Sequence, residues 1–452
     1  MNEVHSASEA GITRVRFGVK RYVNLFRWET VEPLITSLEN ISKSDQYDYF
    51  LPWLGTGLLT STGGQWKRHR RLLTPAFHFK ILDSFMPIMN ENTAKLVNII
   101  GQHKGEAVDI RELIGSCTLD IICETAMGVS IGAQSGNVEY SGPLEIVQNL
   151  IMTRTLNPLH QSDLVYAFTP QGRKYKANLK IIHRFIDQVI ANRRDEMESL
   201  IREKKVNVHQ LASDDLGVIT EKKRYAFLDS LLVTHFQNKA NFTEKNIKDE
   251  VNTFMFEGHD TTATSLIFTL LLVAGDERVQ DKINEELSAV FGNDHSRHVT
   301  IDDCRQLRYL DLVIRESLRL YPSVPFIGRE TTQDFMIKNY RIPAGCTCLI
   351  YIYLMNRDKR VFEKPEKFIP ERFLPGDSPV NKLPYSYLPF SAGSRSCIGQ
   401  RFAMLEMKTV LATVLRQYRL TAVTKRDQVD VEFVVLLKTH SPVCISFEKR
   451  HQ

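Results

Sequence analysis

No stretch of this sequence is apolar for long enough to cross a membrane. The longest apolar run, residues 266–275 with one threonine inside, falls far short of the ~20 residues that a spanning helix needs. The N-terminus has no basic segment followed by an apolar one, so it lacks the pattern of a secretion signal. We therefore expect that the chain as given does not cross a membrane.

An even, regularly spaced set of cysteines is also lacking. The seven cysteines are scattered widely, which argues against a secreted disulfide framework and favours a reducing compartment. Cys346 and Cys348 have the spacing of a metal-binding pair, but they alternate within a strand-like run, residues 346–351. We interpret them as core or half-buried residues of a strand.

A strong charge of one sign is missing, since the net charge is only +5. Basic residues also do not alternate with aromatic ones, as they do in proteins that bind single-stranded nucleic acid. This small excess of positive charge fits an acidic protein partner or an anionic membrane surface at least as readily as nucleic acid. We expect no nucleic-acid partner. Repeats and clear linkers are absent from the sequence too. With 43% hydrophobic residues, enough for a sizeable core, residues 1–452 are expected to form one domain.

Hydrophobic periodicity predicts a mainly helical fold with small β-sheets. One long helix is expected where apolar residues recur from Ile181 to Ile190, and another from Thr243 to Val273 after a cap at Asn241 or Thr243. The other expected segments are strands at 14–19, 22–26, 330–353, 431–437 and 443–447, helices at 29–38, 307–318 and directly after Cys397, a mobile loop at 202–224 and an irregular proline-rich stretch at 364–389.

The segment around Cys397 carries the strongest chemical signal. Gly393 lies four residues before the cysteine and Gly399 two after it, and glycines tolerate the positive φ of a turn that brings amides close to a sulfur. The helix that follows stabilises a thiolate through its dipole and free N–H groups, and Arg395 adds a positive charge. The alternative is a buried structural cysteine after a glycine-rich turn.

The pattern Phe-x-x-Gly-x-Arg-x-Cys-x-Gly, from Phe390 to Gly399, resembles the haem-binding signature of the cytochromes P-450 at every fixed position. The resemblance implies the cytochrome P-450 fold, with haem b bound through Cys397 and with Phe390, Gly393 and Gly399 beside the cofactor. A thiolate ligand favours O–O cleavage, so the implied reaction inserts one atom of O₂ into a C–H bond. Electrons would come from NADPH through a flavoprotein reductase that docks on the cysteine side, with cytochrome b5 as a further candidate partner.

Three charged residues fit a structural network behind the haem. Glu316 and Arg319 lie three residues apart on a predicted helix and can pair, although such pairs are common on surface helices. In the family, the equivalents of Glu316, Arg319 and Arg372 lock the segment that carries the cysteine. A buried network of this kind needs every member.

Trp66 and Arg70 lie four residues apart and therefore face the same way on a helix. An indole N–H and a guanidinium suit a carboxylate. The resemblance implies that Trp66, Arg70 and Arg395 hold the haem propionates, with Arg329 as a further candidate.

Residues 250–262 resemble the oxygen-side helix of the family. Asp260 and Thr261 fit its acid–alcohol pair, which relays protons through water, and Gly258 lets the helix approach the haem. Without the Cys397 signature, the threonines of this helix would be interpreted as ordinary packing.

Glu257 indicates one branch of the family. The run from Phe254 to Thr262 resembles family 4, the fatty-acid ω-hydroxylases, in which this glutamate can form an ester with a haem methyl group. A fixed haem and a narrow channel would favour attack at the terminal carbon of a fatty-acid chain. The rival interpretation is a protonated or water-bridged Glu257, because an unpaired buried carboxylate is costly.

Residues 52–60, 73–79 and 119–128 agree with this branch, while Asn252 and Ser396 depart from its usual residues. Neither departure touches the core chemistry. The branch implies a lipophilic substrate, and the sequence does not fix which one.

The hydrophobic anchor, hinge and first helix of the family are not visible before Gly11, so we expect an N-terminally truncated form of a family member. The resemblance implies an enzyme at the cytosolic face of the endoplasmic reticulum membrane. We expect the chain as given to be soluble or peripheral to that membrane. Two alternative functions stay open. One is a haem-thiolate isomerase or dehydratase without need of O₂, against which the pair Asp260 and Thr261 argues. The other is an inactive haem-binding paralogue.

Overall fold

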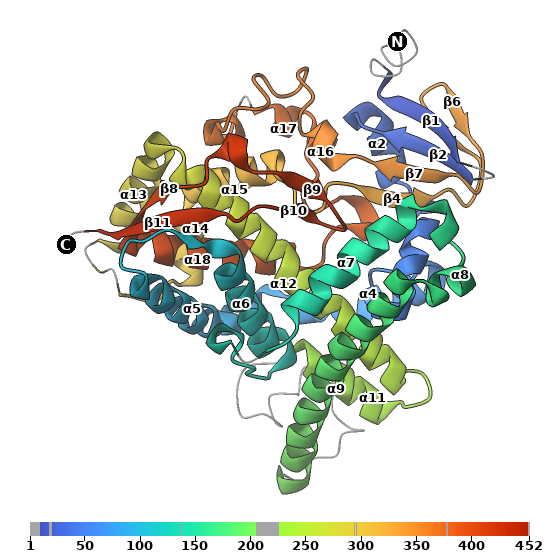
Figure 1. Ribbon diagram of the computed structural model, residues 1–452, viewed down its shortest axis with the longest axis horizontal. Helices are drawn as coiled ribbons and strands as arrows, with labels where there is room; N and C mark the ends of the chain where they lie inside the picture. The colour runs from blue at the N-terminus through green and yellow to red at the C-terminus, as the bar shows by residue number, and fades with distance from the viewer. Residues whose placement is uncertain are drawn as a thin grey trace.

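The computed structural model describes residues 10–17, 20–136, 138–204, 226–292, 294, 296–376 and 378–450. Helices make up most of it, and the strands form small sheets, one of them beside the N-terminus (Figure 1). This confirms the mainly helical fold that the sequence predicts. The α-helices are α2 Trp28–Ile35, α3 Leu51–Leu54, α4 Gly63–Leu73, α5 Phe79–Gln102, α6 Ile110–Ile122, α7 Ser141–Leu156, α8 Asp163–Phe168, α9 Pro170–Lys204, α11 Phe227–Gln237, α12 Glu244–Ala274, α13 Glu277–Phe291, α14 Ile301–Gln306, α15 Arg308–Leu320, α16 Ile352–Met355, α17 Pro379–Lys382 and α18 Gln400–Gln417.

Helix α12 runs through the middle of the molecule and packs against α6, α9, α15 and α18 (Figure 1). It begins with a capping box in which the Thr243 hydroxyl accepts the N–H of Asn246, so Thr243 is the cap. Most of its residues are buried, as expected for a helix surrounded by protein. This helix is therefore a rigid support for any side chain that points from it into a cavity.

The largest sheet has the strand order β1-β2-β7-β4, with β2 and β7 parallel and the other neighbours antiparallel. Cys348 lies in β7 and Cys346 just before it, both buried, which confirms the strand interpretation. The strands are β1 Ile12–Phe17, β2 Lys20–Leu25, β3 Val108–Asp109, β4 Ile327–Glu330, β5 Phe335–Ile337, β6 Tyr340–Ile342, β7 Thr347–Ile350, β8 Tyr418–Ala422, β9 Val431–Phe433, β10 Leu437–Thr439 and β11 Cys444–Lys449.

Some predicted boundaries shift. The first two strands begin two residues early because the hairpin register pairs Ile12 with Leu25. The helix expected to reach residue 38 ends at Ile35, and residues 352–355 form α16 in place of a strand. Of the loop expected at 202–224, residues 202–204 end α9, and the remainder lies outside the described residues.

The stretch from residue 364 to 389 is irregular, as predicted, apart from single helical turns. It lies between α15 and the segment that carries Cys397, so its conformation decides where that cysteine sits. Within the described ranges, no helix combines the length and the apolarity needed to span a membrane.

Candidate active site

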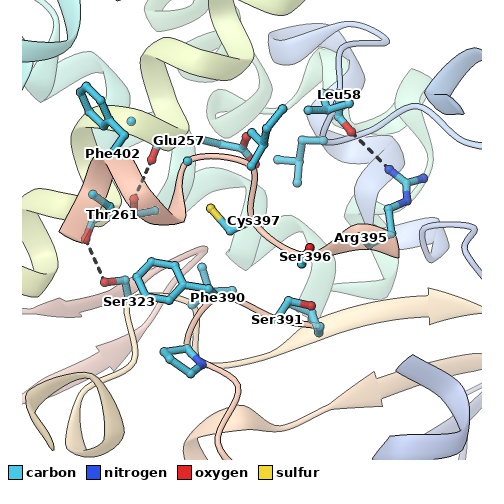
Figure 2. A pocket seen from close by; sticks show the side chains of 18 of the residues that line it. Leu58, Glu257, Thr261, Ser323, Phe390, Ser391, Arg395, Ser396, Cys397 and Phe402 are labelled. Atoms are coloured by element: carbon cyan, nitrogen blue, oxygen red, sulfur yellow. Dashed lines mark hydrogen bonds between the residues drawn. The ribbon is translucent and has the colours of Figure 1, made fainter. Parts of the chain in front are cut away.

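A cavity of about 220 Å³ lies between α12 and the segment that leads into α18. Figure 2 shows the Cys397 sulfur directed into it, between Glu257 and Thr261 on one side and Arg395 on the other. The predicted site residues that line it are Trp66, Arg70, Glu257, Thr261, Arg329, Phe390, Arg395, Cys397 and Gly399. Those outside its lining are Asp260, Gly393, Glu316, Arg319 and Arg372.

The turn before Cys397 requires a glycine at position 393. Gly393 has φ +66°, and a Cβ there would lie 2.1 Å from the carbonyl oxygen of Ile35 in α2. The turn is closed by the N–H of Cys397, which donates to the carbonyl of Phe390 at 2.8 Å. Gly399 differs from the prediction in one respect, because its φ of −87° is ordinary.

The amides after Cys397 act on its thiol as predicted, but burial outweighs them. Burial and the charge of Glu257 raise the pKa of the Cys397 thiol to about 11, while Arg70 and the N–H groups of Gly399 and Gln400 lower it. The side chain is nevertheless open to the cavity. A bound metal ion would deprotonate such a thiol outright, which makes the sulfur a competent ligand for an iron at this position.

Four cationic side chains, Lys43, Arg70, Arg329 and Arg395, line one part of the cavity. Burial lowers the pKa of all four, and neighbouring positive charges lower that of Arg395 further, to about 9. Among the described residues, none of the four forms a salt bridge with a carboxylate. Arg329 is buried and the other three are half-buried, and cations withdrawn from water without a paired anion are costly. The cluster therefore suits an anionic ligand, and the two propionates of a haem fit it.

Two arginines also fix the cysteine segment in place. Arg395 donates to the carbonyl of Leu58 at 3.2 Å (Figure 2) and to that of Ile41 at 3.1 Å. Its guanidinium lies 4.3 Å from the centre of the Trp66 ring. Arg70 donates to the carbonyl of Ser396 at 2.8 Å. Helix α4 and the cysteine segment are therefore tied together at the cavity wall.

Glu257 projects from α12 into the cavity. Burial raises the pKa of its carboxyl to about 7, and the positive charge of Lys43 opposes this shift. This upward shift favours the protonated, neutral form of the carboxyl at a higher pH than for an exposed glutamate. Both interpretations of Glu257, as a neutral acid and as an ester-forming nucleophile, agree with its place on the cavity wall.

Thr261 lines the cavity one turn after Glu257, and its hydroxyl donates to the carbonyl of Glu257 at 2.6 Å (Figure 2). Gly258 lines the cavity as well, but a Cβ there would lie 2.5 Å from the side chain of Ile122. The glycine therefore permits the close approach of α12 to α6, in addition to opening the cavity.

Asp260 points elsewhere. Its carboxylate accepts a hydrogen bond of 2.7 Å from the amide of Gln148 in α7 and pairs with Lys438 of β10. These contacts lower the pKa of Asp260 despite its burial. The adjacent residues of the predicted acid–alcohol pair thus lie on different sides of α12.

The predicted charge network is assembled. Glu316 accepts from Arg319 Nε at 2.7 Å and from Arg372 Nε at 3.0 Å, and its carboxylate also accepts the N–H of Ile369. Arg319 donates to the carbonyl of Asn356 at 2.8 Å. The contacts join α15 to the irregular stretch that precedes the cysteine.

Sequence reasoning missed four residues at or near the site: Lys43, Gln148, Ser323 and Lys438. Lys438 is 178 residues from its partner Asp260, so no local spacing could have indicated the pair. Lys43 lies within the polar run 42–46, where a solvated charge is the usual interpretation.

Comparison with known proteins agrees with this geometry. The family model described as Cytochrome P450 matches residues 4–445. "Cytochrome P450 4V2" of Mus musculus is 41% identical over 443 residues, covering 98% of this chain and 83% of the relative. "Cytochrome P450 4c3" of Drosophila melanogaster is 40% identical, with 95% and 80% covered, and "Cytochrome P450 4c21" of Blattella germanica is 39% identical, with 96% and 85% covered.

A match over nearly the whole chain, together with a cysteine that faces a cavity lined by one buried and three half-buried cations, implies haem b as cofactor and a redox partner as electron source. The chain belongs to the cytochrome P450 family and is a haem-thiolate monooxygenase.

Proposed function

We propose that this cytochrome P450 hydroxylates fatty acids or related lipids at or near the ω end. The observation that carries the proposal is the position of Glu257, which projects from the rigid α12 onto the same cavity wall as Thr261 and opposite Cys397. A haem bound there supplies the activation of O₂. The proposal takes residues 1–452 as one haem domain.

Cys397 is proposed as the iron ligand, with Phe390, Gly393 and Gly399 shaping the turn beside it. In the described part of the chain the cavity cations have no carboxylate partner, which supports a role for Arg70, Arg395 and Arg329, with the indole of Trp66, in binding the propionates. Asp260 and Thr261 are the proposed proton carriers, the threonine hydroxyl at the cavity and the carboxylate behind it. Glu316, Arg319 and Arg372 hold the segment that carries the cysteine.

Glu257 is proposed to form an ester with a haem methyl group, in which the carboxylate oxygen would replace one methyl hydrogen. This two-electron oxidation of the methyl group would use O₂ and two electrons from NADPH, as hydroxylation does, and would release two waters. Such a bond removes the cost of an unpaired carboxylate in a buried site and fixes the haem in one orientation. A fixed haem under a narrow channel restricts which carbon reaches the reacting centre, so the terminal methyl group competes with the weaker internal C–H bonds. An acid–acetone wash tests the bond, because haem that extracts freely carries no ester.

The proposed electron source is NADPH, through a flavoprotein reductase, with cytochrome b5 as a second donor. The proposed location is the cytosolic face of the endoplasmic reticulum membrane. Support for a membrane surface comes from the region around α8, where Leu159, Leu164 and Phe168 are 75%, 71% and 78% exposed. These side chains are suited to dip into the interface of a bilayer.

The deciding experiment incubates the holoenzyme with NADPH, reductase and saturated fatty acids of increasing length, and locates the hydroxyl group by mass spectrometry. We expect substrate-induced shifts of the Soret band and products hydroxylated mainly at the terminal carbon. Products hydroxylated only at internal carbons would refute ω-selectivity, and turnover without NADPH or O₂ would indicate an isomerase or dehydratase.

A further inference from the structure

We propose that the β9–β10 hairpin, residues 431–439, positions the acid–alcohol pair, with Lys438 holding the carboxylate of Asp260 and Ser323 linking the hairpin to Thr261. The inference rests on the proposed roles of Asp260 and Thr261, and it names the residues that orient them. Lys438, Gln148 and Ser323 are positioning residues, since they act through the pair.

Three separate elements meet at the Asp260 carboxylate. Asp260 lies on α12, Gln148 donates to it from α7 at 2.7 Å, and Lys438 pairs with it from β10. The Asp260 side chain is only 6% exposed, whereas that of Lys438 is 28% exposed. Lys438 is thus the charged group between the buried carboxylate and solvent, and together with Gln148 it fixes the direction in which the Asp260 carboxylate points.

The same strand reaches Thr261 by a second route. The N–H of Leu437, next to Lys438, donates to the carbonyl of Ser323 at 2.9 Å. The Ser323 hydroxyl in turn donates to the carbonyl of Thr261 at 2.9 Å, and it lies 2.7 Å from the hydroxyl of Ser265. Adjacent residues of β10 therefore contact adjacent residues of α12, one directly and one through Ser323.

The other ionisable groups around Asp260 do not replace Lys438. His259 on α12 is 3% exposed, and burial lowers its pKa to about 4, so it is neutral near pH 7. Tyr140, just before α7, is 1% exposed, and burial raises the pKa of its phenol. Lys438 is therefore the cation that keeps Asp260 ionised, and Gln148 can only donate a neutral hydrogen bond.

A misplaced carboxylate has a chemical consequence. Hydroxylation consumes O₂, two electrons and two protons and yields one hydroxyl group and one water. If the second proton does not reach the correct oxygen, the same two electrons and two protons leave as hydrogen peroxide. Removal of Lys438 leaves a buried carboxylate without its cation, which favours the protonated, reoriented acid and therefore peroxide.

The experiment compares Lys438→Met with the conservative Lys438→Arg and with Lys425→Met, which replaces an exposed lysine outside the cluster. Each holoenzyme is supplied with NADPH, reductase and a fatty acid, and the ratio of hydroxylated product to peroxide is measured against pH. We expect Lys438→Met to lower this ratio roughly tenfold or more and to move its pH midpoint upward. Lys438→Arg restores both, because it restores the cation, and Lys425→Met changes neither.

An infrared measurement provides a readout that does not depend on turnover. Lys438→Met is expected to gain a carbonyl band of a protonated carboxylic acid that disappears in the double variant with Asp260→Asn. Gln148→Leu serves as a second variant if Lys438→Met does not fold. We expect it to lower the ratio of hydroxylated product to peroxide as well, but by less.

The outcomes separate this inference from the proposed function. If Asp260→Asn lowers the product-to-peroxide ratio while Lys438→Met behaves like Lys425→Met, the positioning role is wrong and the acid–alcohol pair stands. If Asp260→Asn and Thr261→Ala both leave the ratio unchanged, the pair itself is wrong and the inference falls with it.

Discussion

Glu316 and Arg319 form an ion pair of 2.7 Å in which neither side chain is exposed to solvent. Glu316 also accepts from Arg372, so removal of its charge leaves both arginines without their carboxylate partner. We expect Glu316→Gln to lower the free energy of unfolding by about 3–5 kcal/mol. The measurement is thermal unfolding together with the ratio of haem to protein, which falls as the irregular stretch loosens.

A pair on the same helix provides the control. Arg315 contacts Asp311 from a side chain that is 48% exposed. We expect Arg315→Gln to change the free energy of unfolding by only about 0.3–0.5 kcal/mol, because water screens the pair. Equal losses for Arg315→Gln and Glu316→Gln would contradict the structural role of the buried network.

The sequence predicts those parts of the site that depend on local spacing. Of the two predicted caps the structure has Thr243, and both the turn around Gly393 and the pairing of Glu316 with Arg319 are present, since each is closed by residues a few positions apart. Lys438 is different, because its partner comes from a distant strand.

The orientation of Asp260 shows why long-range contacts limit such predictions. Helical spacing places Asp260 and Thr261 only about 100° apart, which leaves open whether both reach the cavity. The hydrogen-bond partners of the two residues determine their directions. Ser323 and Ser265 donate to the backbone carbonyl of Thr261. Gln148 and Lys438 bind the Asp260 carboxylate on another side of the helix.

Gly393→Ala is expected to destabilise the cysteine segment. The new Cβ would lie 2.1 Å from a backbone oxygen in α2, which cannot move without shifting the helix. Gly345→Ala is the matched control, since Gly345 has a similar φ of +71° and no neighbouring atom within 4 Å of the place that an alanine methyl group would take. We expect a loss of about 1–2 kcal/mol for the control from backbone strain alone and about 1–3 kcal/mol more for Gly393→Ala. Thermal unfolding and haem content measure the difference.

Glu406 should make stability depend on pH. It lies on α18, is fully buried, and among the described residues neither carboxyl oxygen has a hydrogen-bond partner. Burial raises its pKa well above the usual 4.5, so the folded protein holds a proton that the unfolded chain releases. Its contribution is therefore fully present below about pH 4.5 and falls by up to about 1.4 kcal/mol for each pH unit above that.

The neutral variant Glu406→Gln removes this slope. We expect its unfolding temperature to exceed that of the original protein at pH 7 and the two to converge near pH 4.5. A difference between the two proteins that does not change with pH would show that Glu406 is ionised in the folded state.

Arg70 and Arg68 lie two residues apart on α4, and only Arg70 lines the cavity, while Arg68 is exposed. If Arg70 binds a propionate, Arg70→Met removes a charge-assisted hydrogen bond worth about 1.5–3 kcal/mol. Transfer of haem to an excess of a haem-free acceptor protein should then be roughly ten- to a hundredfold faster. Arg68→Met should leave the transfer rate unchanged, because its charge is solvated. A similar rate for both variants would mean that the cations of the cavity stabilise the cysteine segment, through contacts such as that of Arg70 with the carbonyl of Ser396, and do not hold the cofactor.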